Sequence, residues 1–232
     1  MVRYNIKITD IIEEIPSIKT FLLEKPSDFN WKEGSHTHIG LLGFDAGEKP
    51  NKALVRHMSI MTLPEENKIG FTTRIMEPLS EFKESLSELH IGDEVVLFKV
   101  GSRIPLRREN KPIVLLSMGV AIATMRPLIH RFIQDRTGIP RLTNININSS
   151  NNFVYKKELT QLENSQYQNH WVDTRSKFYE TLDTVTEQDD SLYYLVGRDD
   201  FLKDVIKYLK EKGIDETSIL IDKKQEKRAK YF

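Results

Sequence analysis

The stretch that decides the fold is PIVLLSMGVAIATMRPLI, residues 112–129 of the 232-residue chain. It opens with an essentially apolar run, which is typical of a strand buried on both faces of a sheet. A turn containing Gly119 follows, and then a helical pattern in which apolar residues share one face. We expect Pro127 in the first turn of that helix, where its missing N–H is tolerated. Strand, turn and helix in this order are the unit of a parallel α/β sheet.

The C-terminal half repeats this alternation. Strands are predicted at residues 143–150, 191–197 and 217–222, and a helix at 199–213 follows the second of them. The expected structure is a Rossmann-like parallel α/β domain over residues 109–232.

The N-terminal half has a different character. Short strands separated by Gly, Pro and Asn turns predict an antiparallel barrel or sandwich over residues 1–108. The predicted strands are residues 4–12, 36–44, 53–61, 67–75 and 92–100. One helix interrupts them, with Ser80 as N-cap and an apolar stripe of Phe82, Leu86 and Leu89. The predicted fold class is therefore β followed by α/β.

The composition excludes several functional classes. The 34 basic and 34 acidic side chains cancel, which argues against a general nucleic-acid binder. There are no cysteines, so disulfides, cysteine-ligated iron–sulfur clusters and a cysteine nucleophile are excluded. Neither a signal core nor an apolar run of membrane-span length is present, so the expected setting is the cytoplasm.

The stretch VRHMSIMT, residues 55–62, combines a charge and a hydroxyl in a β-like run. Arg56 on a rigid strand can hold a phosphate bidentately. Ser59 could then hydrogen-bond a heteroaromatic ring beside that phosphate. The alternative is an arginine paired with a surface carboxylate and a serine on an exposed face.

Two further kinds of motif are weak when taken alone. Leu79 and Ser80 open the helix of the first half, where free N–H groups favour an anion, although Ser80 also suits a simple cap. Gly119 and Gly197 each follow a buried strand, at the sheet edge where ligands bind in open parallel sheets. Two histidines at positions 36 and 38 lack a third ligand, and no metal site is predicted.

The order of these motifs resembles the ferredoxin–NADP reductase superfamily over nearly the whole chain. RHMS resembles the Arg-x-Tyr-Ser flavin motif, and WKEGSHTHIGL before it is similar to the Pro-Gly-Gln strand. GFTTRIMEPLSEFKESLSELHIGDEVVLFKVGS resembles the following flavin block. KPIVLLSMGVAIATMRPLI resembles the nicotinamide turn, and YYLVGRDDFLKDVIKYLKEKGI the Cys-Gly-Pro block. The resemblance implies a flavin-binding β-barrel followed by an NAD(P)-binding domain.

The resemblance also implies a role for each matched residue. Arg56 would hold the flavin pyrophosphate, and Ser59, beside flavin N5, is the candidate catalytic residue. A pyrophosphate held at Leu79 and Ser80 would favour FAD over FMN. The other implied contacts are His57 and Met58 at the isoalloxazine, Thr72, Thr73 and Arg74 at the ribityl and phosphate side, and Gly119, Val120, Ala121, Thr124, Gly197, Arg198 and Asp199 at the nicotinamide nucleotide.

Several positions depart from the family pattern. Met58 replaces the stacking tyrosine, and the nicotinamide turn keeps only Gly119, with Val120 and Thr124 in place of the usual threonine and proline. Val196 and Arg198 replace the cysteine and proline of the last block. Methyl groups in such turns limit how closely the backbone can approach a ligand. Flavin binding is therefore better supported than the binding of a pyridine nucleotide.

These observations predict an FAD-dependent NAD(P)H oxidoreductase that passes a hydride to flavin and electrons onward. The acceptor is left open between a ferredoxin or flavodoxin, ferric chelates, haem, quinones and oxygen, and so is the choice of NADH or NADPH. Lys156, Lys157 and Arg175 could serve a 2′-phosphate. The main alternative is a flavoprotein whose nicotinamide site has decayed. An α/β hydrolase lacks a nucleophile elbow, and a pure interaction protein is a further alternative.

Overall fold

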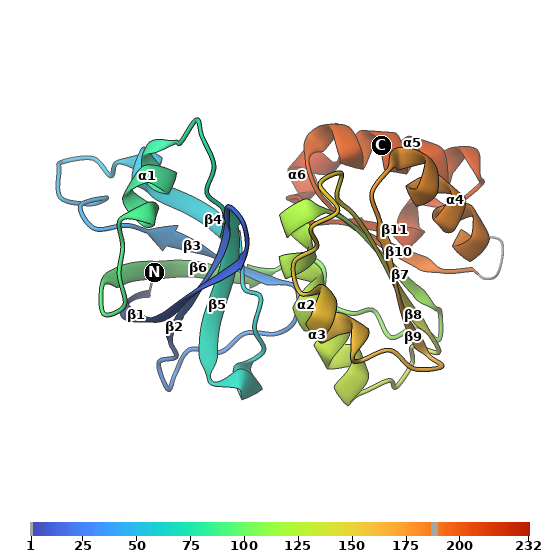
Figure 1. The fold of residues 1–232 in the computed structure, drawn as a ribbon, viewed down its shortest axis with the longest axis horizontal. Coiled ribbons are helices and arrows are strands. Elements are labelled where there is room, and N and C mark those ends of the chain that lie inside the picture. The colour runs from blue at the N-terminus through green and yellow to red at the C-terminus, as the bar shows by residue number, and fades with distance from the viewer. Residues whose placement is uncertain (1, 187–189) are drawn as a thin grey trace. The chain divides into compact units, whose positions relative to one another are not determined.

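The structure is a computed structural model that describes residues 2–186 and 190–232, and it divides into two compact units (Figure 1). The units are Met1–Ser102 and Arg103–Phe232. The sequence placed this division after residue 108. The segment that begins at Arg103 belongs to the second unit because the Tyr194 hydroxyl accepts from the Arg107 amide at 2.8 Å and donates to the Pro105 carbonyl at 3.0 Å.

The first unit is the predicted antiparallel β domain. Its strands are β1 (Arg3–Ile15), β2 (Ile18–Glu24), β3 (Ser35–Gly40), β4 (Val55–Ser59), β5 (Lys68–Arg74) and β6 (Glu94–Ser102). They form one six-stranded antiparallel sheet in the order β4-β3-β6-β1-β2-β5. The sheet is barrel-like but not closed, with β4 and β5 at its edges. Sequence reasoning did not predict β2 and ended the first strand at residue 12, whereas β1 runs to Ile15 and the chain turns at Ser17, with φ of 67°.

Helix α1 (Glu81–Ser87) completes the core of the first unit. Phe82 and Leu86 are fully buried, and Leu89 packs against the same cluster, as the predicted stripe requires. Within that cluster the rings of Phe21 and Phe71 stack with centroids 5.1 Å apart. Burial of each such side chain contributes about 1.5–3 kcal/mol. The helix is therefore held by its apolar face, with its polar residues left for the site.

The second unit is a five-stranded parallel sheet in the order β11-β10-β7-β8-β9. Its strands are β7 (Ile113–Met118), β8 (Leu142–Ile147), β9 (Tyr167–Val172), β10 (Leu192–Val196) and β11 (Ile219–Ile221). Its α-helices are α2 (Ile122–Gln134), α3 (Lys156–Thr160), α4 (Arg175–Thr186), α5 (Asp199–Glu211) and α6 (Gln225–Arg228). Short 3₁₀ turns lie at Gly119–Ala121 and Glu216–Ser218 in this unit, and at Lys52–Leu54 and Pro64–Glu66 in the first unit. The predicted parallel α/β architecture is confirmed.

The two faces of the parallel sheet differ in chemistry. Helices α2 and α3 lie on one side of it, and α4 and α5 lie on the other (Figure 1). On the α4 and α5 side, Ile145 and Ile147 join an apolar cluster with Phe178 and Phe201. The alternate residues of β8, Asn144 and Asn146, are also fully buried, at 0% and 1% exposure. Because side chains alternate along a strand, the asparagines face the α2 side.

The position of Pro127 differs from the prediction. Helix α2 begins at Ile122, so Pro127 lies inside the helix rather than in its first turn. Since proline has no N–H, the carbonyl of Ala123 loses its helical partner. The buried Leu128 and Ile129 that follow hold the helix against the sheet despite this loss.

Edge strand β9 and helix α4 were missed by sequence reasoning. The strand YQNHWV is mostly half-exposed and polar, so it lacks the apolar run that marks the buried strands.

No helix in residues 2–186 and 190–232 has both the length and the apolar composition needed to cross a bilayer.

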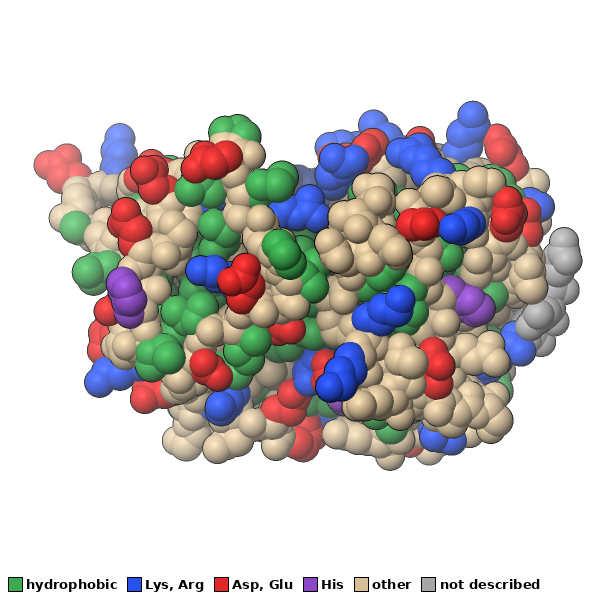
Figure 2. All heavy atoms as spheres, in the orientation of Figure 1, with side chains coloured by type: hydrophobic (Ala, Val, Ile, Leu, Met, Phe, Trp, Pro, Cys, Tyr) green, Lys and Arg blue, Asp and Glu red, His purple; other side chains and the backbone are tan. Residues whose placement is uncertain are grey.

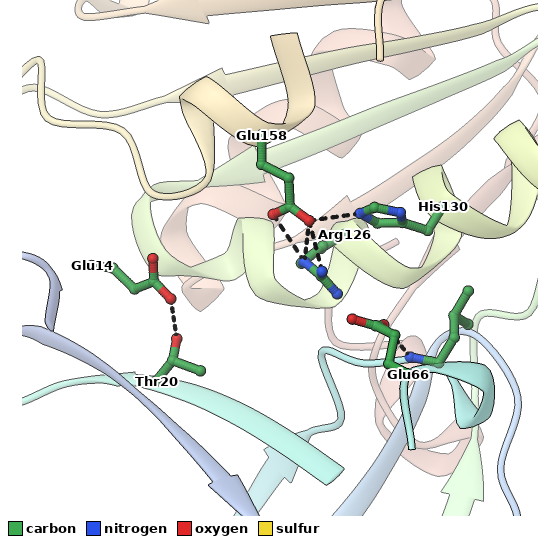
Figure 3. Close-up of polar contacts among 7 residues, drawn as sticks. Glu14, Thr20, Glu66, Arg126, His130 and Glu158 are labelled. Carbon is green, nitrogen blue, oxygen red and sulfur yellow. Dashed lines mark hydrogen bonds and ion pairs between the residues drawn. The ribbon is translucent and has the colours of Figure 1, made fainter. Parts of the chain in front are cut away.

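A charged network joins α3 to α2 in the second unit (Figure 3). Both Glu158 carboxylate oxygens accept from Arg126 Nε at 3.1 Å, and Oε1 also accepts from Arg126 Nη2 at 2.6 Å. His130 Nε2 lies 2.9 Å from the same oxygen. Burial raises the pKa of Glu158, but hydrogen bonds from His130 and Arg126 outweigh it and bring the pKa to about 2.

This network predicts an acid-sensitive contribution to stability. The pKa of Glu158 is lower in the folded than in the unfolded chain, so its contribution is complete above about pH 4.5 and disappears as the pH falls towards 2. With the side chain 35% exposed, we expect Glu158→Gln to cost about 1–2 kcal/mol at pH 7 and almost nothing at pH 2.

The measurement is urea unfolding followed by Trp171 fluorescence in a Trp31→Phe background, which restricts the signal to the second unit. Glu211→Gln is the matched control, because Glu211 is exposed and its ion pair with Lys207 is long, at 3.8 Å. A cost for Glu158→Gln that stays constant from pH 7 to pH 2 would contradict the assignment.

Candidate cofactor site

Three basic side chains gather where α1 meets strands β4 and β5 of the first unit. The guanidinium of Arg56 lies 5.4 Å from the ring centre of Phe82, which is fully buried in α1. Its Nη1 donates to the carbonyls of Ala53 at 3.0 Å and Val55 at 2.9 Å. These contacts hold Arg56, predicted as a pyrophosphate ligand, in one place on its strand.

Lys83 follows Phe82 in α1 and is the second member of the cluster. Its Nζ donates to the Thr73 hydroxyl and to the Arg74 carbonyl at the end of β5. Burial, together with the positive charges of Arg56 and Arg74, lowers the pKa of Lys83 to about 8. Across the residues that the structure describes, none of the three cations forms an ion pair with a carboxylate. The excess positive charge is suited to an anion.

The predicted threonines point to opposite faces of β5. Thr73 contacts Lys83 and so belongs to the cation cluster. Thr72 shares a 2.6 Å hydrogen bond with Thr20, whose hydroxyl also donates to Glu14 at 2.7 Å (Figure 3). The structure therefore brings Thr73 and Arg74 together with Arg56, while Thr72 joins β5 to β2.

The start of α1 differs in detail from the expectation. Ser80 is the N-cap, with extended φ of −83° and ψ of 157°, but its side chain makes no capping hydrogen bond. The Leu79 amide donates to Glu77 Oε2 at 3.1 Å. Because Glu77 already engages this N–H, the anion-binding capacity at this place rests mainly on the three cations.

The other predicted flavin contacts lie on both faces of β4. Met58 packs against the core of the first unit, on the same strand face as Arg56. His57 and Ser59 project to the opposite face, where the His57 ring lies 4.1 Å from the His36 ring and 5.4 Å from the His38 ring. A third imidazole therefore joins the histidine pair seen in the sequence. Within the described part of the chain, no group of His, Cys, Asp and Glu is arranged to hold a metal ion.

In the second unit, the predicted nicotinamide turn is held by hydrogen bonds from Asn146 of the neighbouring strand β8. Gly119 has φ of 55°, a left-handed conformation that favours glycine. Asn146 Nδ2 donates to the Ser117 hydroxyl at 2.8 Å, the Ser117 carbonyl at 3.3 Å and the Gly119 carbonyl at 3.2 Å. Val120 and Ala121 are half-buried. The turn is therefore fixed by a side chain rather than by a run of glycines.

Thr124 lies further along, inside α2, and is 4% exposed. It is buried, like Gly119, whereas Val120 and Ala121 are half-buried. Its place near the start of α2 agrees with the predicted order of strand, turn and helix.

The last predicted segment follows β10. A Cβ placed on Gly197 would lie 2.5 Å from the Phe201 ring, so packing alone requires glycine there. Arg198 is exposed and pairs with Asp200 at 3.1 Å. Asp199 accepts from Lys223 Nζ and Lys230 Nζ at 2.9 Å, and these bonds, with one from Tyr231, lower its pKa.

The C-terminal segment packs on its own unit. The Tyr231 hydroxyl donates to Asp199 at 2.8 Å, and the ring is only 7% exposed within the core of the second unit. Lys210 donates to the Phe232 carbonyl at 3.1 Å. Figure 2 shows Lys and Arg side chains gathered near these C-terminal helices. The Tyr231 ring is therefore part of the core of the second unit.

Two of the three basic residues considered for a 2′-phosphate, Arg175 and Lys156, have other contacts. Arg175 forms an exposed ion pair with Asp204 at 2.8 Å. Lys156 Nζ lies 5.2 Å from the Phe153 ring centre. The structure therefore does not favour NADPH over NADH on the basis of these two cations.

Sequence reasoning missed two residues of these sites. Lys83 lies in the flavin block quoted above, whose helix start resembles Ser-x-Phe-Lys-x-x-Leu at the pyrophosphate, but it was not named as a ligand because only the fold brings Arg56 and Arg74 beside it. Asn146 stood in the alternating stretch TNININSS, where a buried asparagine on every second position was the available signal.

An antiparallel sheet with a short helix packed on its core, followed by a parallel α/β sheet, is the ferredoxin–NADP reductase fold. Comparison with solved structures confirms that the chain has this fold. The chain matches a ferredoxin NADP⁺ reductase from Neisseria gonorrhoeae with bound FAD and NADP at TM-score 0.79 and 14% identity, covering 95% of this chain and 98% of that chain. It matches the ferredoxin-NADP⁺ reductase from Plasmodium falciparum at TM-score 0.78 and 14% identity, covering 95% of each chain.

A third likeness is to the flavohem-like FAD/NAD binding domain of nitric oxide dioxygenase from Vibrio cholerae O1 biovar El Tor. The TM-score is 0.73 at 17% identity, covering 94% of this chain and 97% of that chain. No protein-family model matches the sequence, and a search of curated proteins returns no match. At these identities the likeness shows the fold.

The geometry of the turn predicts that Asn146 is structural. Asn146→Ala removes the amide that joins Ser117 to Gly119, so we expect a loss of about 1–2 kcal/mol in the unfolding free energy of the second unit. Ser117→Ala removes one of the same contacts and serves as the partner in a double-mutant cycle read by Trp171 fluorescence. Strictly additive effects of the two substitutions would contradict the shared contact.

Proposed function

We propose that the chain is an FAD-dependent NAD(P)H oxidoreductase. The observation that carries this proposal is the cation cluster of Arg56, Arg74 and Lys83 on a fold whose solved neighbours include a reductase with bound FAD and NADP. Three cations close enough to act on one another, with no carboxylate partner among the described residues, fit the diphosphate of a dinucleotide better than they fit a purely structural role.

The bound flavin would supply hydride acceptance and electron release, while the protein orients it. Arg56 and Lys83 would hold the diphosphate, with Thr73 fixing the Lys83 ammonium. Met58, on the same face of β4 as Arg56, would border the isoalloxazine. Because β4 is an edge strand, the cofactor could also reach its opposite face, where His57 would border the ring and Ser59 would donate a hydrogen bond to flavin N5 rather than act as an acid or base. Arg74 would line the adjoining side of the cofactor, whereas Thr72 is directed to Thr20 of β2.

In the second unit, the Gly119 turn and the segment after β10 would receive the nicotinamide nucleotide. Support comes from their place at the carboxyl ends of β7 and β10, where ligands bind in open parallel sheets. Val120 and Ala121 add side chains to a turn that must approach the ligand closely. That feature favours the second candidate, a flavoprotein of the same fold that relays electrons without using NADH or NADPH itself.

Flavin binding is tested by Arg56→Ala. The purified wild-type protein should bind FAD and be yellow, and Arg56→Ala should weaken FAD binding about 10- to 100-fold, since a charge-assisted contact is lost. Fluorescence titration with FAD measures both affinities. The control is Arg3→Ala, because Arg3 forms an exposed ion pair with Asp45 in the same unit. A wild-type protein that takes up no FAD would overturn the proposal.

Nicotinamide use is tested by rapid mixing. Under anaerobic conditions, the flavin-loaded protein should bleach on mixing with NADH or with NADPH in stopped-flow experiments. The preferred nucleotide is the one that gives the faster reduction. Absence of reduction by both, in a protein that binds FAD, selects the electron-relay alternative. Reduction followed by assays with ferredoxin, flavodoxin, ferric chelates, haem, quinone and oxygen then identifies the acceptor.

A further inference from the structure

Lys83 is the least expected member of the cation cluster, and its surroundings distinguish it from the two arginines. It is half-buried on α1, beside Phe82 at the edge of the core. Its Nζ donates a partly buried hydrogen bond to the Thr73 hydroxyl and an exposed one to the Arg74 carbonyl. Its amine is thus held at a fixed place on the structure, whereas a surface lysine would move freely in solvent.

The neighbouring charges act in one direction on this amine. Arg56 on β4 and Arg74 at the end of β5 are both positive and both disfavour a third positive charge. The nearby carboxylates are directed elsewhere, since Glu77 accepts from the Leu79 amide and Glu81 from Asn51 Nδ2 at 2.7 Å. Glu84 is exposed on α1. Burial and the two arginines, rather than these carboxylates, set the charge of Lys83.

The hydrogen bonds of the Lys83 amine give a second argument that its charge changes when a phosphate binds. A neutral lysine has two N–H groups, and Thr73 and Arg74 accept both. Protonation adds a third N–H, which neither of these partners uses. A phosphate oxygen beside the amine would accept that third N–H and would offset the repulsion from the two arginines.

We propose that Lys83 is a direct ligand of the dinucleotide's diphosphate and that it takes up a proton from solvent as the diphosphate binds. The step converts the neutral amine to an ammonium ion, and the proton comes from the buffer. This proposal rests on the proposed function, because it takes FAD as the source of the diphosphate. It makes cofactor binding itself dependent on pH.

The expected size of the effect follows from the charge of free Lys83. With a pKa of about 8, roughly a quarter of the free protein carries charged Lys83 at pH 8.5, and a bound diphosphate restores nearly full charge. FAD binding at pH 8.5 should therefore take up about 0.7 proton, against about 0.1 at pH 7. The affinity should fall about twentyfold between pH 7 and pH 9.5.

The experiment is isothermal titration of the full chain with FAD in two buffers that differ in ionisation enthalpy, at pH 7 and pH 8.5. Lys83→Arg keeps a permanent charge, so its binding should take up no proton and should vary little with pH. Lys83→Met should take up no proton and bind FAD at least tenfold more weakly. Lys68→Arg, at the exposed opposite end of β5, is the matched control and should behave as wild type.

Equal proton uptake by wild type and Lys83→Arg, or unchanged FAD affinity in Lys83→Met, would overturn the proposal while leaving FAD binding intact. Failure of the proposed function looks different, since the wild-type protein would then bind no FAD at any pH. In that case a parallel titration with inorganic pyrophosphate decides the role of Lys83. Proton uptake that is lost in Lys83→Met would support Lys83 as a ligand of the diphosphate. Pyrophosphate binding that does not need Lys83, or no pyrophosphate binding, would overturn that role.

Discussion

The burial of Phe82 is the constraint on which the candidate site of the first unit depends. Its ring is fully buried in the core cluster, which fixes the rotation of α1 about its own axis. The same ring lies under the Arg56 guanidinium, and the next residue along the helix is Lys83. One buried ring therefore has both cations beside it, because Arg56 of β4 lies over the ring and Lys83 is the next residue of α1. Hydrophobic packing supplies the free energy that holds like charges close together.

The second unit solves a comparable problem with polar groups. A parallel sheet is normally apolar on both faces, yet Asn144 and Asn146 are buried on the α2 side. Their Nδ2 groups donate to Asn169 at 3.0 Å and to the Ser117–Gly119 turn. The buried Oδ1 atoms of both asparagines have no hydrogen-bond partner among the described residues, so each amide is only half satisfied. The polar row thus ties the turn after β7 and the edge strand β9 to the core.

The fold was largely predictable from sequence because hydrophobic period and turn residues agree along most of the chain. The runs PIVLLS and SLYYLVG, and the stripe of Phe82, Leu86 and Leu89, each correspond to the element expected. Strand β9 was missed because an edge strand needs little apolar surface. Helix α4 was missed although Phe178, Leu182 and Val185 form a buried stripe at helical spacing. Pro127 was misplaced because packing by Leu128 and Ile129 overrides its local preference.

The candidate site was predictable only in part. Arg56, Thr73 and Arg74 were found through motif order, and the structure brings them together. Lys83 lies in the same motif block nine residues after Arg74, but its approach to Arg56 of β4 follows only from the fold. Thr72 was included by its place next to Thr73, although alternation along a strand sends neighbouring side chains to opposite faces. Asp199 has contacts with Lys223 and Lys230 that depend on the return of the chain end.

Gly197 shows what a glycine after a strand can and cannot signify. Any larger residue there would collide with the Phe201 ring, 2.5 Å from where its Cβ would lie. Selection for a packed helix–strand junction would therefore preserve this glycine even in a descendant that had lost every ligand. The informative positions for tracing a nucleotide-binding lineage are those, such as Lys83, whose side chains the core does not need.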